Sequence, residues 1–225
     1  MTTAFQKIYL LVAVLHLASL LLVYDILSSV TKPLLMPVLI LWYLSATRGH
    51  RSQLHYIMTG AFVFSWVGDV LLMKKDELFL LGGLGAFLIT HLLYIGVFTK
   101  EVKEAGRDMI LKRKPWLALP FIGLTAGMII LIFNHLEASM KLPVVVYALV
   151  ITVMVIMAIA RYGNVDYRSF QSVLLGAMLF MISDSLIALD RFYFKGHLWQ
   201  ADFFIMTLYI SGQFLIAKGS AQAIR

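Results

Sequence analysis

Short polar segments divide the chain into long apolar runs, and this pattern limits the possible folds more than any motif does. A helix needs about 20 apolar residues to cross the hydrocarbon core of a membrane, with roughly 17–25 usual. Hydrophobic residues make up 61% of the 225 and charged residues only 14%, which is more apolar surface than one soluble core would bury. The pattern therefore predicts an all-α polytopic membrane protein.

We expect one transmembrane domain, 1–225, with eight transmembrane helices. The second run is short when it begins at Pro33, so the helix would be tilted or would start earlier in the chain. Seven spans is the alternative if this run does not cross. The first run lacks a convincing small-residue cleavage site, so we interpret it as a retained span rather than a signal peptide. The predicted spans are 8–24, 33–47, 54–73, 79–98, 115–134, 142–160, 169–189 and 201–218.

The distribution of lysine and arginine predicts the orientation of these spans. Thirteen of these residues lie on the side that holds both termini and six on the other. Cytoplasmic loops carry the excess of positive charge, so both termini are predicted to be cytoplasmic. The basic loop 100–114 contributes most, and we interpret it as contacting anionic headgroups of membrane lipids rather than nucleic acid. The pattern suits a bacterial inner membrane, and an endomembrane would give a similar one.

Two aspartates stand inside apolar runs, at matching positions of an internal repeat. Gly60–Asp69 (GAFVFSWVGD) resembles Gly176–Asp184 (GAMLFMISD) with a gap of one residue. An offset of four spans preserves orientation, which predicts parallel halves related by an axis along the membrane normal. Both aspartates would then lie at similar depth, near the outer ends of spans three and seven. The two halves would be 1–110 and 111–225.

A charged carboxylate is expensive inside a membrane, roughly 2.5–3.5 kcal/mol near the bilayer centre. Asp69 has a structural interpretation, an acid at the interface paired with Lys74 or Lys75. A second acid at matching depth, Asp184, favours a functional interpretation for both. Ser65 and Ser183 could hydrogen-bond the carboxyl groups or return their hydroxyls to the helix backbone.

Arg191 follows Asp184 by seven residues and could lie above it on the same helix face. An acid in an apolar setting keeps its proton and an acid beside a cation loses it, so the pair would supply one acid and one base. Which aspartate is the acid stays open, and Arg191 favours Asp69.

Several other polar residues are candidates for lining a cavity. His91 and Tyr94 share one helix face, although His91 would lie deeper than Asp69 unless helices tilt or span four starts later; it could instead be a packing residue. Lys32 could meet a lipid phosphate or an aspartate. The remaining candidates, which could equally be packing residues or interface anchors, are Tyr147, Tyr209 and Gln213.

In these segments the chain resembles the YhhN-like family of integral membrane proteins, which includes lysoplasmalogenases. The resemblance runs through most of the chain and implies an eight-span enzyme that hydrolyses the vinyl ether bond of a lysoplasmalogen. The products would be a fatty aldehyde and glycerophospho-ethanolamine or glycerophosphocholine. The segments are TKPLL with Lys32, FSWVGDVLLM with Asp69, FLITHLLY with His91 and Tyr94, GAMLFMISDSLIAL with Asp184 followed by Arg191, and YISGQ with Tyr209 and Gln213.

That chemistry suits Asp69 and Asp184, which their places in apolar runs and in the repeat single out independently of the family resemblance. An enol ether is hydrolysed by protonation at its β-carbon, which gives an oxocarbenium ion that water captures. The step needs a protonated acid and an anion, and glycosidases use two carboxyl groups for the same type of cation. Asp69 and Asp184 would meet that need without a metal or cofactor.

Two other functions compete with this interpretation. An intramembrane aspartyl protease also uses paired aspartates, but no Y-D partner or P-A-L segment accompanies VGD here. A transporter or lipid-binding protein built from parallel repeats could use the aspartates for protons or cations. The absence of cysteine excludes thiolate chemistry and disulfides. Headgroup preference and oligomeric state are left open.

Overall fold

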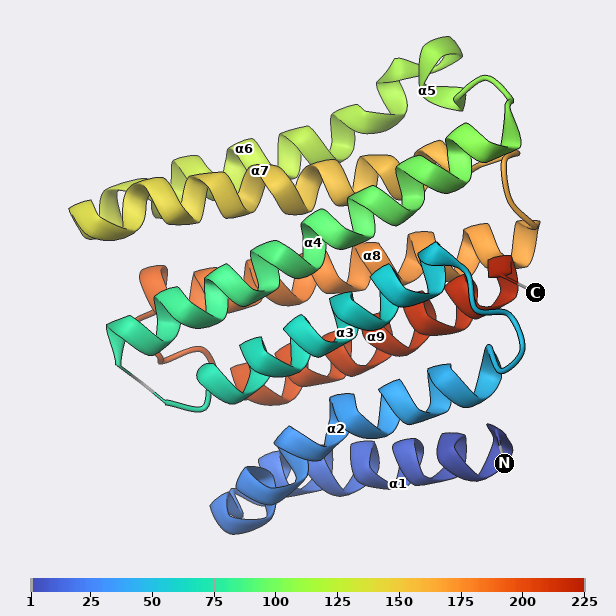
Figure 1. The fold of residues 1–225 in the computed structure, drawn as a ribbon. Coiled ribbons are helices and arrows are strands. Elements are labelled where there is room, and N and C mark those ends of the chain that lie inside the picture. Colours follow the sequence, from blue (N-terminus) through green and yellow to red (C-terminus); the bar gives the residue numbers. More distant parts are fainter. Residues whose placement is uncertain (1, 75, 225) are drawn as a thin grey trace.

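The computed structural model describes residues 2–74 and 76–224 and is built from long helices that run side by side (Figure 1). Both termini lie at one end of the bundle, which we call the terminal end, and the connections α3–α4 and α8–α9 lie at the other. The elements in order are α1 (Thr2–Leu21), α2 (Asp25–Ala46), α3 (Gln53–Leu71), α4 (Glu77–Ala105), α5 (Ile110–Arg113), η1 (Pro115–Ala118), α6 (Leu119–Ile132), η2 (Phe133–His135), α7 (Ala138–Ala160), α8 (Tyr167–Ala188), the π-turn η3 (Leu189–Tyr193) and α9 (Ala201–Ile224).

Seven of the described helical segments are long and apolar enough to cross a membrane. They agree with the first seven predicted spans in place, although several are longer than predicted. The eighth long helix, α9, has 24 residues and runs alongside the others, but it falls outside this set of seven. The chain is therefore an all-helical integral membrane protein with seven candidate spans. The candidate spans are Thr3–Leu21, Asp25–Ala46, Gln53–Leu71, Glu77–Ala105, Pro115–His135, Ala138–Ala160 and Tyr167–Tyr193.

The second helix begins eight residues before the predicted start at Pro33. It starts at Asp25, so that Pro33 and Pro37 lie inside it. A proline has no N–H to offer the carbonyl four residues earlier, and Pro37 therefore leaves the Pro33 carbonyl without its helical donor. The indole of Trp66 on α3 donates to that carbonyl at 3.0 Å. The hydrogen bond satisfies the exposed backbone oxygen and ties α2 to α3.

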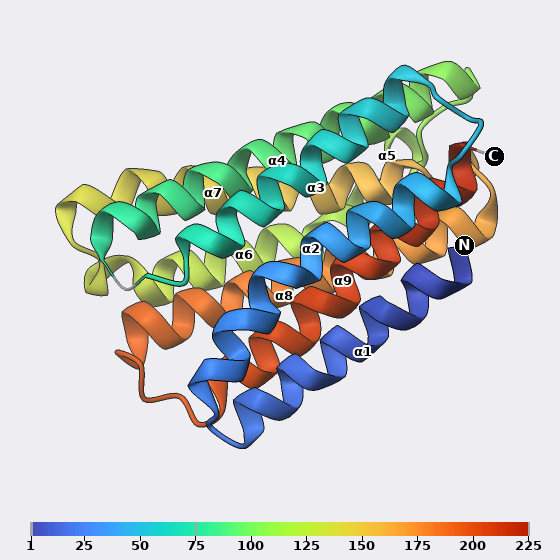
Figure 2. The same cartoon turned by 60° about the horizontal axis from the view of Figure 1, so that its bottom comes forward.

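The last helix, α9, packs against α8 most extensively and also against α1, α2 and α3. Glycines allow the close approach of α8 and α9. A Cβ atom at Gly176 would lie 2.7 Å from the Gly212 carbonyl oxygen, and a Cβ at Gly212 would lie 2.9 Å from that of Gly176. Small residues at such crossings let helix backbones touch in membrane proteins. As a result, α9 lies within the bundle rather than at its edge (Figure 2).

A buried ion pair stabilises the terminal end of the bundle. Glu101 on α4 accepts from Arg161 at the end of α7, with Nε to Oε2 at 2.7 Å and Nη2 to Oε1 at 3.3 Å. Arg161 also donates to the Ser169 hydroxyl at 2.9 Å, and that hydroxyl donates to the Gly219 carbonyl at 2.7 Å. The cluster joins α4, α7, α8 and α9 with every strong donor matched to an acceptor.

Candidate functional site

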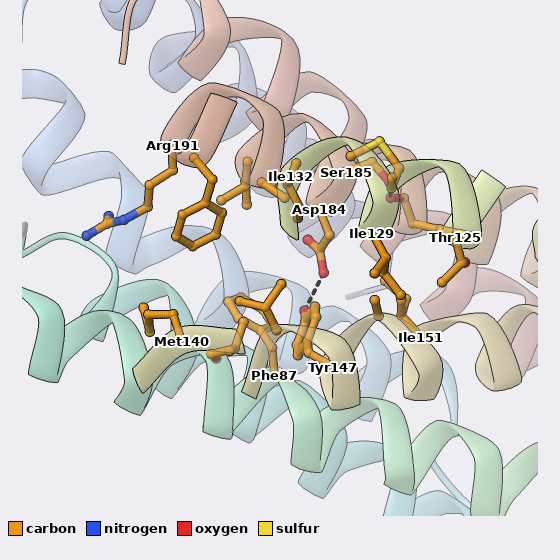
Figure 3. A pocket seen from close by; sticks show the side chains of 18 of the residues that line it. Phe87, Thr125, Ile129, Ile132, Met140, Tyr147, Ile151, Asp184, Ser185 and Arg191 are labelled. Atoms are coloured by element: carbon orange, nitrogen blue, oxygen red, sulfur yellow. Dashed lines mark hydrogen bonds between the residues drawn. The ribbon is translucent and has the colours of Figure 1, made fainter. Parts of the chain in front are cut away.

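Asp184 lies in α8, four residues before its end, at the end of the bundle opposite the termini. The hydroxyl of Tyr147, from α7, donates to its Oδ2 atom (Figure 3). His91 of α4 lies beside both, with Nε2 2.9 Å from the Tyr147 hydroxyl and 3.7 Å from Oδ2. Three helices, α4, α7 and α8, thus bring one carboxyl, one phenol and one imidazole into contact.

The three groups form a chain along which a proton can pass. Because Tyr147 gives its only hydroxyl hydrogen to Asp184, its oxygen is free to accept from Nε2–H of His91. When His91 carries a hydrogen on both ring nitrogens, shifting one hydrogen along each bond would place a proton on Asp184 and leave a neutral imidazole. The other ring nitrogen, Nδ1, is buried without a hydrogen-bond partner among the described residues.

A pocket opens beside Asp184, between α4, α6, α7 and α8 (Figure 3). Its volume is about 90 Å³. One water molecule needs roughly 10–15 Å³, so the pocket has room for several waters or for part of a hydrocarbon chain. Most of the side chains that line it are aliphatic or aromatic, and Asp184 and Tyr147 are its central polar groups. The helix α6 forms its outer wall and buries only Thr125 and Ile132 of its own residues.

Asp69 lies in α3, two residues before its end, and is 4% exposed. The hydroxyl of Tyr209, from α9, donates to its Oδ2 atom at 2.7 Å. The Lys32 ammonium on α2 and the Asp184 carboxyl are both within electrostatic range. The described residues that line the pocket include neither Asp69 nor Tyr209. The two aspartates therefore occupy neighbouring but different environments.

Two further candidates, Tyr94 and Gln213, belong to a buried network one turn below Tyr209. The Tyr94 hydroxyl donates to Oε1 of Gln213 at 2.7 Å, and Nε2 of Gln213 donates to the Ser65 hydroxyl at 2.9 Å. Ser65 in turn donates to Thr90 at 3.3 Å. Ser65 thus contacts the amide of Gln213 rather than the carboxyl of Asp69, and the network joins α3, α4 and α9.

The remaining candidates lie at the edges of these clusters. Ser183 donates to the Ile205 carbonyl of α9 at 3.0 Å and so joins two helices. Arg191 lines the pocket, with its guanidinium pointing away from Asp184 in Figure 3. Of the two lysines considered as partners of Asp69, Lys74 lies over the ring of Phe79 at 4.4 Å, and Lys75 is outside the described residues.

Sequence reasoning missed Phe87, whose ring lies between the two aspartate environments. It lines the pocket and also packs edge-to-face on Tyr209, with ring centroids 5.9 Å apart. A signal was present, because Phe87 precedes His91 by four residues and so shares its helix face. Within the described part of the chain, no three His, Asp or Glu side chains are grouped closely enough to hold a metal ion.

The fold and these clusters define a class: an integral membrane protein whose helices enclose two tyrosine-bound carboxyl groups at one end. The sequence profile of the YhhN family matches residues 27–220, and the chain belongs to that family. It is 30% identical to human lysoplasmalogenase TMEM86B over 183 residues, which cover 81% of this chain and 70% of the human protein.

Other relatives carry the same activity in their names. Bovine lysoplasmalogenase TMEM86A is 27% identical over 206 residues, covering 84% of this chain and 76% of the bovine protein. A lysoplasmalogenase from Mycobacterium bovis is 30% identical over 111 residues, covering 49% of this chain and 40% of the bacterial protein. No solved structure shows significant similarity to the chain.

Proposed function

We propose that the protein is a membrane hydrolase that cleaves the vinyl ether bond of a lysoplasmalogen, by acid–base catalysis with Asp184 and Asp69. The observation that carries the proposal is the position of Asp184. Its carboxyl group reaches an apolar pocket and accepts a hydrogen bond from Tyr147, which is in turn bonded to His91. The names of the family relatives support the reaction and the substrate class.

Asp184 is the residue we assign as the general acid, because it is the aspartate that meets the pocket. It would transfer a proton to the β-carbon of the enol ether, and the electron pair of the double bond forms the new C–H bond. The resulting oxocarbenium ion adds water, and the hemiacetal then breaks into aldehyde and glycerol hydroxyl. Asp69 takes the proton of the attacking water and later releases it to bulk water. Asp184 would regain a proton through Tyr147 from a protonated His91, which in turn takes one from bulk water, so the enzyme gains and loses no net proton per turnover.

Asp69 is the second carboxyl group in this mechanism. The Lys32 ammonium, within electrostatic range, would favour its anionic form. As an anion it would stabilise the developing cation and accept a proton from the attacking water, as the second carboxylate of a glycosidase does. Tyr209 holds it by a hydrogen bond at 2.7 Å and fixes its orientation. This division of roles reverses the weak preference that Arg191 gave to Asp69 as the acid.

The pocket suits a lipid with one chain. Its aliphatic lining would contact the alkenyl chain, and the peripheral helix α6 faces the side from which a bilayer lipid arrives. Arg191 and Lys32, near the same end of the bundle, are candidates to meet the phosphate of the headgroup. Other predicted binding residues, Tyr94 and Gln213 with Ser65 and Ser183, would hold the helices around the site.

We further propose that α9 crosses the membrane as an eighth span, with both termini in the cytoplasm. Its 24 residues run the length of the bundle, and both termini lie at the same end (Figure 1). The positive charge gathered at that end supports a cytoplasmic location, in a bacterial inner membrane. The repeat supports two halves, 1–110 and 111–225, within one transmembrane domain.

Aldehyde release from detergent-solubilised protein tests the proposed activity. Lysoplasmenylethanolamine and lysoplasmenylcholine should both be compared with a lysolipid whose ether-linked chain is saturated, which has no enol ether to protonate. We expect aldehyde from one or both alkenyl lipids and none from the saturated one. If neither alkenyl lipid is cleaved, the hydrolase is wrong, and transport across sealed vesicles becomes the function to examine.

A further inference from the structure

The ring of Phe87 stands where the pocket ends and the surroundings of Asp69 begin. Phe87 lines the pocket but is itself only 6% exposed, so most of its surface faces the protein interior. On that inner side its ring packs edge-to-face on Tyr209, which holds Asp69. The side chain therefore touches the pocket with one edge and the Asp69 environment with the other.

The backbone of α3 has a recess for this ring. A Cβ atom at Gly68 would lie 2.7 Å from two ring atoms of Phe87, closer than real Cβ atoms come to their neighbours. The ring thus lies directly against the residue before Asp69. A second ring, Phe180, packs edge-to-face on Phe87 with centroids 5.8 Å apart and on His91 with centroids 4.9 Å apart. These contacts hold the Phe87 ring between the pocket and the residues around Asp69.

We propose that Phe87 is a positioning residue that partitions the site, keeping Asp69 away from the pocket until its ring moves aside and both carboxyl groups face one substrate. This inference rests on the proposed function, because it assumes that a lipid must meet Asp184 and Asp69 together. In the enzyme without substrate, the Phe87 ring would shield Asp69 from water and from any molecule in the pocket. Asp69 would reach the substrate only after the ring has moved aside.

Carbodiimide labelling tests the partition without any use of activity. Dicyclohexylcarbodiimide is an apolar reagent that modifies protonated carboxyl groups, and peptide mass spectrometry identifies the modified aspartate. In detergent-solubilised parent protein at acidic pH, we expect label on Asp184 and little on Asp69. In Phe87→Ala we expect label on both. The proposal would be overturned by label on Asp69 in the parent protein. It would also be overturned by the absence of label on Asp69 in a folded Phe87→Ala protein.

A matched control lies on the same helix and in the same pocket. Leu80 is 5% exposed and lines the pocket, but it packs in a separate apolar cluster with Ile132 and Met140. Leu80→Ala should enlarge the pocket and leave Asp69 unlabelled. Label on Asp69 in this variant as well would show that general loosening, rather than loss of the Phe87 ring, exposes the carboxyl group.

Two more variants guard against a Phe87→Ala protein that fails to fold. Gly68→Ala adds the Cβ atom that the ring cannot tolerate in place, so it should displace the ring and expose Asp69 to the reagent. Phe87→Trp puts a larger ring in the same recess, and we expect kcat to fall about tenfold or more with KM little changed, because the catalytic group is then misplaced. If Asp69 remains unlabelled in Gly68→Ala, or if kcat is unchanged in Phe87→Trp, the proposal that the Phe87 ring shields Asp69 and must move is contradicted.

These outcomes separate the partition from the proposed hydrolase. If the parent protein releases no aldehyde but the labelling follows the expected pattern, the partition stands and the reaction is wrong. If aldehyde is released and Asp69 is labelled in the parent protein, the reaction stands and the partition is wrong.

Discussion

The predicted repeat would put Asp184 and Asp69 in matching places, yet the fold surrounds them differently. Asp184 has a side chain 12% exposed, reaches the pocket, and is held by a tyrosine from its own half of the chain. Asp69 is closed in behind Phe87 and is held by Tyr209, from the other half. Tyr94 follows Asp69 by 25 residues, as Tyr209 follows Asp184. A symmetric repeat would therefore have Tyr94 hold Asp184 as Tyr209 holds Asp69, but Tyr94 donates to Gln213 instead.

The difference shows how two similar segments can produce two unlike carboxyl groups. Both acids lie near the same end of the bundle, and their different neighbours give them different access to the pocket and to a proton. Asp184 is linked to His91 through Tyr147 and can regain a proton by that chain. Asp69 lies behind the ring of Phe87 and is shielded from water. Unequal surroundings are what one acid and one base require.

The largest expected effect comes from Asp184→Asn. The amide keeps the shape of the side chain and can still accept from Tyr147, but it has no acidic proton to transfer. We expect aldehyde release to fall by about 10³-fold or more, at the upper end of what general acid catalysis contributes. The measurement is kcat with lysoplasmalogen on protein shown by size-exclusion chromatography to be folded. Retention of most activity would remove Asp184 from the mechanism.

A smaller loss is expected from Asp69→Asn, about 10²-fold, because the acid at Asp184 and its proton supply remain intact. The Tyr209 hydroxyl can still donate to the amide oxygen, so the thermal midpoint should change little. Kinetics of the two Asn variants and the double variant, measured side by side, would sharpen the comparison. If Asp69→Asn proved the more damaging change, the roles assigned to the two aspartates would have to be exchanged.

Removing the tyrosine hydroxyls one at a time tests the two environments directly. Tyr147→Phe cuts the link to His91 and removes the hydrogen bond that stabilises the Asp184 anion left after proton transfer, which is worth roughly 1.5–3 kcal/mol, so kcat should fall about tenfold to a hundredfold. Tyr209→Phe affects only the orientation of Asp69 and should cost less. His91→Ala provides the check on the proton chain, since it should resemble Tyr147→Phe in kcat. Equal losses in the two Phe variants would contradict the asymmetry.

The smallest effect on catalysis is expected at a third buried acid, Glu101, which has a bidentate arginine partner at the other end of the bundle. Glu101→Ala leaves Arg161 buried and unpaired, a change that typically destabilises by about 3–5 kcal/mol. We expect a clear drop in thermal midpoint and unchanged turnover per folded molecule. A loss of turnover in the folded variant would mean that the two ends of the bundle communicate.

The sequence was sufficient to predict the helices and both aspartates, because hydropathy and burial cost are properties of single segments. The tyrosine partners of those aspartates could not be predicted from the sequence, because Tyr147 and Tyr209 lie 37 and 140 residues away on other helices. Only the packing of helices decides such contacts. Of the two interpretations of the short second run, the earlier start is confirmed and the start at Pro33 is wrong. Pro33 resembles a first-turn residue, and the sequence did not show that Trp66 would donate to the carbonyl that Pro37 leaves without a helical donor.

The position of α9 has a consequence for how the protein is made. Of the described helices, α9 leaves the ribosome after all the others, yet it packs between α8 and the first three helices and carries Tyr209 and Gln213. The earlier helices must therefore be made before the helix that packs among them. Until residues 201–224 have been made, Asp69 lacks the hydroxyl of Tyr209, whereas Asp184, Tyr147 and His91 are all already present.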